Sequence, residues 1–92
     1  MNAKNKQLYE AILKLKNIDE AARFLRDLLT LPEIEDFSTR LEIARLLSQN
    51  KFSYEQIAKK CLVSTTTVTR VSHWLNHGMN GYKLILSRLS RS

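Results

Sequence analysis

Five hydroxyl side chains fall within six consecutive positions, from Ser64 to Thr69, and they are the residues of this sequence best suited to chemistry. Ser64 is a typical N-cap, so a helix is expected to begin at Thr65. Threonine is a poor choice for a helix with only a structural role, because β-branching restricts its side chain. Its hydroxyl can instead meet bases or phosphates, and its methyl can contact the methyl group of thymine. The run predicts a helix that reads DNA, with these candidate contacts: Ser64, Thr65, Thr66, Thr67 and Thr69.

The element that must position this helix is a second helix directly before it. Ser53 and Gln56 form a capping box that would start this helix at Tyr54. Ala58 is small enough to let the two helices cross closely, and apolar residues recur where the helices would face each other: Ile57, Cys61, Val63, Val68 and Val71. Residues 53–76 therefore resemble a helix-turn-helix in pattern. The alternative is an ordinary helical hairpin whose threonines are merely exposed.

One position in this motif departs from the usual pattern. The turn of a helix-turn-helix generally contains glycine, because one residue adopts a left-handed conformation. Leu62 occupies that position here, at an expected cost of about 1 kcal/mol.

The charge distribution indicates an anionic partner for the second half of the chain. Residues 1–50 contain eight Lys or Arg and eight Asp or Glu, whereas residues 51–92 contain seven basic residues and a single acid, Glu55. Nucleic acid is the first candidate for the partner, an anionic membrane is the second, and a solvated basic surface is the alternative without a partner. Within the motif, Lys59, Lys60 and Arg70 are the candidate contacts to phosphates.

The rest of the chain is predicted to be all-α. Two glycines and one proline in 92 residues favour helices over β-hairpins. Apolar periodicity predicts six helices, over about residues 4–16, 18–29, 31–48, 54–60, 65–76 and 82–89. Capping residues support the starts of the second and third helices: Asn17 with Glu20, or Asp19 alone, and a capping box of Thr30 and Glu33. A chain of this length is expected to form a single domain.

Other classes of function find little support. No nucleophile–base–acid set or phosphate-binding loop is evident, so we expect neither an enzyme nor a cofactor. His73 and His77 are four residues apart, but no third metal ligand accompanies them. The single cysteine suits a reducing cytosol, and neither a signal peptide nor a membrane-spanning run is apparent, so a cytoplasmic protein without membrane contact is expected.

Two stretches carry a resemblance to a known family. The segment LTLPEIEDFSTRLEIARLL, residues 29–47, and the segment TTTVTR, residues 65–70, resemble the tryptophan-repressor superfamily, and the chain is similar in particular to its YerC/YecD group. The resemblance implies an intertwined homodimer, with residues 4–48 and 81–90 as dimerisation helices and two helix-turn-helix heads in successive major grooves of double-stranded DNA. We therefore expect a homodimeric transcriptional repressor. The alternative is a helix-turn-helix module used for RNA or protein interaction.

The resemblance also implies a pocket for a small-molecule effector. Arg40 and Arg70 match the two arginines that flank the indole in the tryptophan repressor, and Thr30 matches a threonine near the ligand carboxylate. Val71 and Trp74 stand where the repressor has a glycine and a serine, and both are larger. The added bulk argues against tryptophan as the effector.

Overall fold

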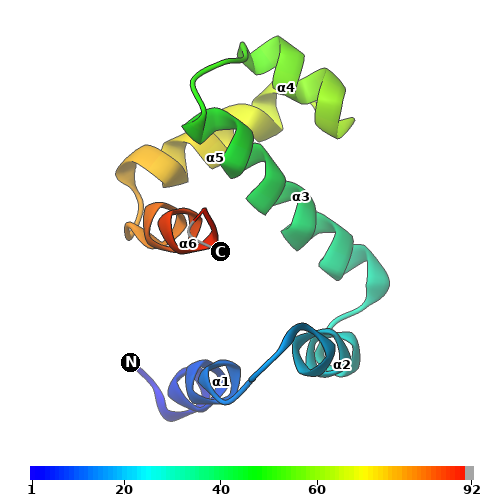
Figure 1. The fold of residues 1–92 in the computed structure, drawn as a ribbon, viewed down its shortest axis with the longest axis vertical. Helices are drawn as coiled ribbons and strands as arrows, with labels where there is room; N and C mark the ends of the chain where they lie inside the picture. The colour runs from blue at the N-terminus through cyan, green and yellow to red at the C-terminus, as the bar shows by residue number, and fades with distance from the viewer. Residues whose placement is uncertain (91–92) are drawn as a thin grey trace. The chain divides into compact units, whose positions relative to one another are not determined.

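The computed structural model describes residues 1–90, which form six α-helices and no strand (Figure 1). The helices are α1 (Ala3–Leu13), α2 (Ile18–Leu28), α3 (Leu31–Ser48), α4 (Tyr54–Cys61), α5 (Thr65–His77) and α6 (Gly81–Leu89). The predicted all-α, six-helix fold is confirmed. The chain divides into two compact units, residues 1–35 and the residues from 36 onward. The single domain expected from chain length stays a prediction. No helix in the described part is both long and apolar enough to cross a membrane.

Side-chain caps fix where the helices begin, as the sequence predicts. The Glu33 carboxylate accepts a hydrogen bond from the backbone N–H of Thr30 at 2.9 Å, and Thr30 Oγ1 accepts one from the N–H of Glu33 at 3.3 Å. These hydrogen bonds from Thr30 hold the pKa of Glu33 below its usual value. The same reciprocal pair joins Ser53 and Gln56 at the start of α4, at 2.8 and 3.1 Å. Each box satisfies backbone donors that an uncapped helix would leave without partners.

One helix end differs from the sequence prediction by three residues, and the other boundaries agree to within one residue. Helix α1 ends at Leu13 rather than near residue 16, which leaves Leu15 outside the helix. The reason is that the following residues serve the start of α2: Asn17 caps it, and the N–H of Lys16 donates to the Glu20 carboxylate at 3.0 Å. At the other end of the chain, Gly81 is the first residue of α6 rather than part of the preceding loop.

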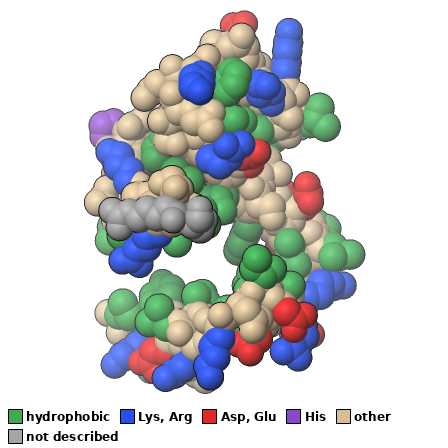
Figure 2. Space-filling model, in the orientation of Figure 1, with side chains coloured by type: hydrophobic (Ala, Val, Ile, Leu, Met, Phe, Trp, Pro, Cys, Tyr) green, Lys and Arg blue, Asp and Glu red, His purple; other side chains and the backbone are tan. Residues whose placement is uncertain are grey.

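The first unit leaves an apolar face uncovered. Neither α1 nor α2 contains a buried residue. Hydrophobic side chains gather along one side of these two helices, as Figure 2 shows. Leu8, Ile12 and Leu28 retain 37%, 45% and 50% of their surface exposed to solvent. A single copy of this unit therefore has apolar surface without a core.

The second unit contains the core of the chain. Helices α4 and α5 pack against each other, and α6 packs against α5 (Figure 1). Ile43 from α3, Ile57 from α4 and Val68 from α5 are fully buried, and they meet in one cluster with Ala44, Leu46, Ala58 and Val71. The apolar residues expected to face each other in the helix-turn-helix all belong to this cluster or pack against it.

The turn between α4 and α5 has the conformation that the sequence predicts. Leu62 has φ 57° and ψ 46°, in the left-handed region, and its side chain is 91% exposed. The N–H groups of Leu62 and Val63 both donate to the carbonyl of Ala58, which closes the last turn of α4. These hydrogen bonds give the Ala58 carbonyl, near the end of α4, its partners, but they require a backbone conformation that leucine seldom adopts.

Replacing Leu62 by glycine is expected to raise the free energy of unfolding by about 0.5–1 kcal/mol, because relief of the left-handed strain exceeds the added entropy of the unfolded chain. Urea unfolding followed by circular dichroism measures this difference. Leu62→Ala is the matched control, since alanine keeps the Cβ and loses no buried contact, and it should unfold like the unmodified protein. Equal stability of the glycine and alanine variants would show that the turn is not strained.

Candidate functional site

The candidate site is the exposed start of α5, held in place by α4 and the turn. Ser64 caps α5, and its Oγ accepts a hydrogen bond from the backbone N–H of Thr67 at 3.2 Å. The first turn of α5 contains no acidic residue, whereas those of α2, α3 and α4 all do. The positive end of the α5 dipole is therefore not neutralised by the helix itself, which favours the approach of an anion.

The structure separates the hydroxyls at this site into two groups. Ser64 Oγ and Thr67 Oγ1 lie 3.2 Å apart and share a hydrogen bond, and Thr69 Oγ1 donates to the carbonyl of Thr65 at 3.0 Å. The side chains of Thr65 and Thr66 are exposed, and neither hydroxyl has a hydrogen-bond partner within residues 1–90. Of the four threonines, these two can offer both the donor and the acceptor of the hydroxyl to a ligand.

The basic residues around this helix start are not neutralised by acids of the chain. Lys59, Lys60 and Arg70 are exposed, and the ion pairs of the described residues all lie in α1, α2 and α3. Lys60 Nζ lies over the Phe52 ring, 4.7 Å from its centroid, which partly orders that side chain. Figure 2 shows Lys and Arg side chains spread over the part of the molecule formed by α4, α5 and α6. This surface can bind several phosphates.

A polar contact between α4 and α5 escaped the sequence analysis. Tyr54 Oη and Ser72 Oγ lie 2.5 Å apart and share a hydrogen bond. Asn76 Nδ2 donates to the carbonyl of Ser72 at 2.9 Å and to its Oγ at 3.3 Å. Ser72 and Asn76 are one helical turn apart, which is a visible pattern, but Tyr54 is eighteen residues from Ser72 and no local signal pairs them.

The residues expected to form an effector pocket have separate structural surroundings. Thr30 lies in the first unit, where its hydroxyl caps α3. The Arg40 guanidinium lies 5.4 Å from the centroid of the Phe37 ring, and Arg70 is exposed. Val71 is only 4% exposed and belongs to the core, whereas Trp74 is 59% exposed. Val71 thus occupies packed space, and the assignment of an effector to these five positions stays a prediction.

The histidines of α5 form an aromatic cluster with this tryptophan rather than a complete metal site. The rings of His73 and Trp74 meet edge to face at 5.9 Å, and those of His73 and His77 are 5.4 Å apart. Within the described residues, no group of three or more His, Cys, Asp and Glu side chains comes close enough together to hold a metal ion.

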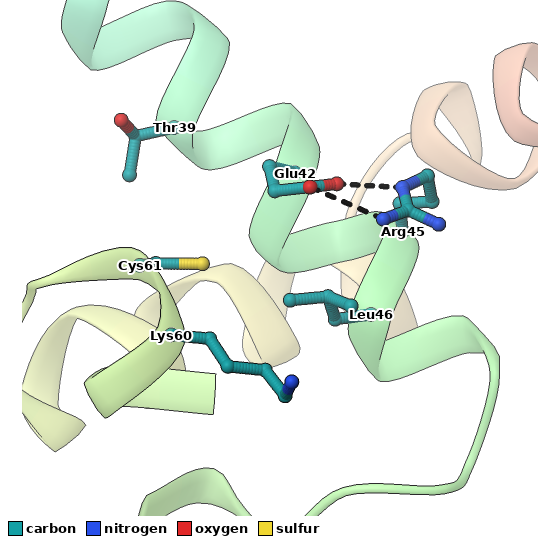
Figure 3. A pocket seen from close by; sticks show the side chains of 6 residues that line it. All are labelled: Thr39, Glu42, Arg45, Leu46, Lys60 and Cys61. Atoms are coloured by element: carbon teal, nitrogen blue, oxygen red, sulfur yellow. Dashed lines mark hydrogen bonds and ion pairs between the residues drawn. The ribbon is translucent and has the colours of Figure 1, made fainter. Parts of the chain in front are cut away.

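A pocket of about 420 Å³ opens between α3 and α4, and its lining includes Lys60, one of the candidate phosphate contacts (Figure 3). Its lining comprises Thr39, Glu42, Arg45 and Leu46 from α3 and Lys60 and Cys61 from α4. The Arg45 guanidinium donates two hydrogen bonds to the Glu42 carboxylate, at 2.6 and 3.1 Å, and thereby lowers the pKa of Glu42. Burial, with a smaller contribution from the Glu42 charge, raises the pKa of the Cys61 thiol. The charges that line this pocket are therefore mostly paired with each other.

Comparison with known proteins identifies the family. The profile of the family described as Trp repressor protein matches residues 3–90, nearly the whole chain. The chain belongs to this family. The family has a regulator-like fold and is not a family of enzymes. The resemblance predicted from residues 29–47 and 65–70 is thus confirmed.

Three similar proteins agree with this chain along most of its length. The uncharacterized protein YerC of Bacillus subtilis (strain 168) is 38% identical over 86 residues, which cover 94% of this chain and 82% of YerC. A TrpR-like protein from Eubacterium eligens ATCC 27750 superposes with a TM-score of 0.91 at 40% identity, covering 97% of this chain and 91% of that one. A crystal structure of a candidate Trp repressor from Staphylococcus aureus gives the same TM-score at 36% identity, with 98% and 89% covered.

Proposed function

We propose that this protein is a homodimeric transcriptional repressor that reads the major groove of double-stranded DNA with the N-terminal end of α5. The observation that carries the proposal is the pair of exposed hydroxyls at Thr65 and Thr66, which have no hydrogen-bond partner in residues 1–90. They stand at the start of a helix with no acid in its first turn. In the helix-turn-helix docking mode, of which the tryptophan repressor is a standard example, these positions contact base edges.

The basic residues beside α5 supply the part of the binding energy that does not depend on sequence. Lys59, Lys60 and Arg70 are exposed and have no ion-pair partner within residues 1–90, so contact with phosphates would break no ion pair. Release of counterions from DNA would then drive binding and make it sensitive to salt. Thr65 and Thr66 would add the preference for particular bases.

The homodimer is proposed because a single chain leaves too much apolar surface in water. Helices α1, α2 and α6 contain no buried residue. Several large apolar side chains on these helices and on α3 are exposed, and the following six are 37–81% exposed: Leu8, Ile12, Leu13, Phe37, Ile85 and Leu89. Monomeric proteins seldom leave apolar helix faces of this kind in contact with water. A second copy presents equivalent apolar faces and would cover them in a closed, two-fold assembly.

An RNA-binding or protein-interaction module is the second candidate function. The same motif serves other functions in other proteins, and the fold alone does not exclude them. The hydroxyls of Thr65 and Thr66, which have no hydrogen-bond partner within residues 1–90, favour base recognition in duplex DNA, because short polar side chains suit the major groove. A selection of duplexes from random DNA distinguishes the two, since only the regulator enriches one sequence.

The first prediction separates base contacts from phosphate contacts. Thr65→Ala or Thr66→Ala should lower the preference for the selected sequence by about 1–3 kcal/mol. Lys59→Gln and Lys60→Gln should each weaken binding to every duplex and reduce the salt slope by about 1. Fluorescence anisotropy at several salt concentrations measures both quantities.

Thr69→Ala is the matched control for the two threonine variants, because its hydroxyl already bonds the carbonyl of Thr65. It should change the preference least. If the lysine variants kept the full salt slope, this face of the protein would not be the one that meets DNA.

The second prediction concerns assembly. Sedimentation equilibrium should show a dimer at micromolar concentration. Ile12→Asp, which places a charge on the apolar stripe of α1, should raise the dimer Kd at least about a hundredfold, equivalent to about 2.7 kcal/mol. Met79→Asp is the control, since Met79 is 92% exposed in a loop and should leave the dimer intact. A monomeric unmodified protein would contradict the proposal.

The third prediction is that tryptophan is not the effector. Val71 fills packed space, so the protein should give no heat on titration with millimolar tryptophan and no change in DNA affinity when it is added. Val71→Gly with Trp74→Ser restores the small residues of the tryptophan repressor and is the variant that could gain binding. Trp74→Ser alone is its control, because it leaves the core intact. Saturable binding by the unmodified protein would overturn this prediction.

A further inference from the structure

We infer that Tyr54, acting through Ser72 and Asn76, is a positioning residue that fixes the orientation of α5 and thereby the sequence preference of the protein. The inference rests on the proposed function, and it concerns a residue outside the set of expected DNA contacts. It starts from the hydrogen bonds that link the beginning of α4 to the middle of α5.

These hydrogen bonds hold the end of the helix pair that the turn does not hold. The turn at Leu62 joins the last residue of α4 to the beginning of α5. Tyr54 is the first residue of α4 and is fixed there by the capping box at Ser53, and it bonds Ser72 in the second half of α5. The two helices are therefore tied at two separated points, so α5 cannot swing about the turn without breaking the Tyr54–Ser72 bond.

The apolar contacts between the two points favour a range of crossing angles rather than a single one. Ile57, Ala58 and Val68 pack together in the core, and the angles of packed helices scatter by about 15–20°. A hydrogen bond is directional and weakens steeply when its angle or length changes. The hydrogen bonds that join Tyr54, Ser72 and Asn76 thus narrow the range of angles between α4 and α5 that packing alone allows.

The length of α5 amplifies small rotations. Thr65 and Thr66 precede Ser72 by seven and six residues, which correspond to about 10 Å along the helix axis at 1.5 Å per residue. A tilt of about 10° about the turn would move Ser72 by roughly 2 Å over that length and would turn Thr65 and Thr66 through the same angle relative to α4. Hydrogen bonds from these threonines to bases would weaken, because they depend on angle. Contacts to phosphates through long lysine side chains would adapt to the same movement.

Ser72 is the buried member of this chain of hydrogen bonds. Ser72 is 8% exposed and is the single buried polar residue in the described part of the chain. A buried hydroxyl is costly unless it is hydrogen bonded. Asn76 Nδ2 donates to Ser72 Oγ from within α5, so this oxygen keeps one hydrogen bond when the Tyr54 hydroxyl is absent. The Tyr54 hydroxyl can therefore be removed without leaving a buried group unpaired.

The test compares sequence preference with general affinity in Tyr54→Phe. The ratio of affinities for the selected duplex and a scrambled duplex should fall about tenfold or more, the scale expected when a good base contact is lost. Affinity for the scrambled duplex should stay within about twofold, because the phosphate-binding lysines are unchanged. Ser72→Ala should reproduce the effect, and the double variant should be no worse than either single variant, since all three remove the same bond.

Tyr82→Phe is the matched control. Tyr82 packs against the same core from α6, and its hydroxyl makes no hydrogen bond within residues 1–90, so its removal should leave the ratio unchanged. Unmodified protein that prefers one duplex, together with a Tyr54→Phe variant that keeps the full ratio, would overturn the inference and leave the proposed function standing. A uniform loss of affinity for both duplexes, with a matching loss of thermal stability, would also overturn it. Unmodified protein without any preference would overturn the proposed function itself.

Discussion

The close crossing of α4 and α5 is the contact on which the rest of the candidate site depends. Ala58 permits this approach because it is small, and Leu62 permits it because the backbone accepts a left-handed residue there. Without the crossing, Ile57 and Val68 could not be fully buried against Ile43 of α3. The exposed start of α5 is thus held in place by core residues that are not themselves at the surface. Because the core supplies the stability, the exposed start of α5 can consist of polar residues that contribute little to it.

The two units differ in whether one copy of the chain can bury their apolar side chains. The second unit can bury a core by itself, whereas α1 and α2 bury nothing and have apolar sides that remain in contact with water. A chain of 92 residues has limited interior volume, so not every amphipathic helix can be satisfied within one copy. Folding of the first unit is therefore expected to depend on assembly, while the second unit has the contacts to order itself.

The features that the sequence predicted correctly are those encoded locally. The caps at Asn17, Thr30, Ser53 and Ser64 each involve residues three positions apart, and all four are present in the structure. The early end of α1 was missed because the residues after it are used by the next helix, a competition that periodicity does not register. The hydrogen bonds that occupy the hydroxyls of Thr67 and Thr69, and so distinguish them from Thr65 and Thr66, depend on side-chain rotamers. The hydrogen bond between Tyr54 and Ser72 depends on tertiary packing. The spacing of residues in the sequence predicts neither.

The surroundings of Cys61 have a consequence for redox chemistry. Cysteine reacts with peroxides and disulfides as the thiolate, and partial burial near Glu42 raises the pKa of this thiol, which lowers the fraction present as the thiolate. Cys61 is the only cysteine in the sequence, so no second thiol of the same chain is available to form a disulfide with it. The Cys61 thiol is therefore expected to react with oxidants more slowly than a free cysteine, because less of it is present as the thiolate.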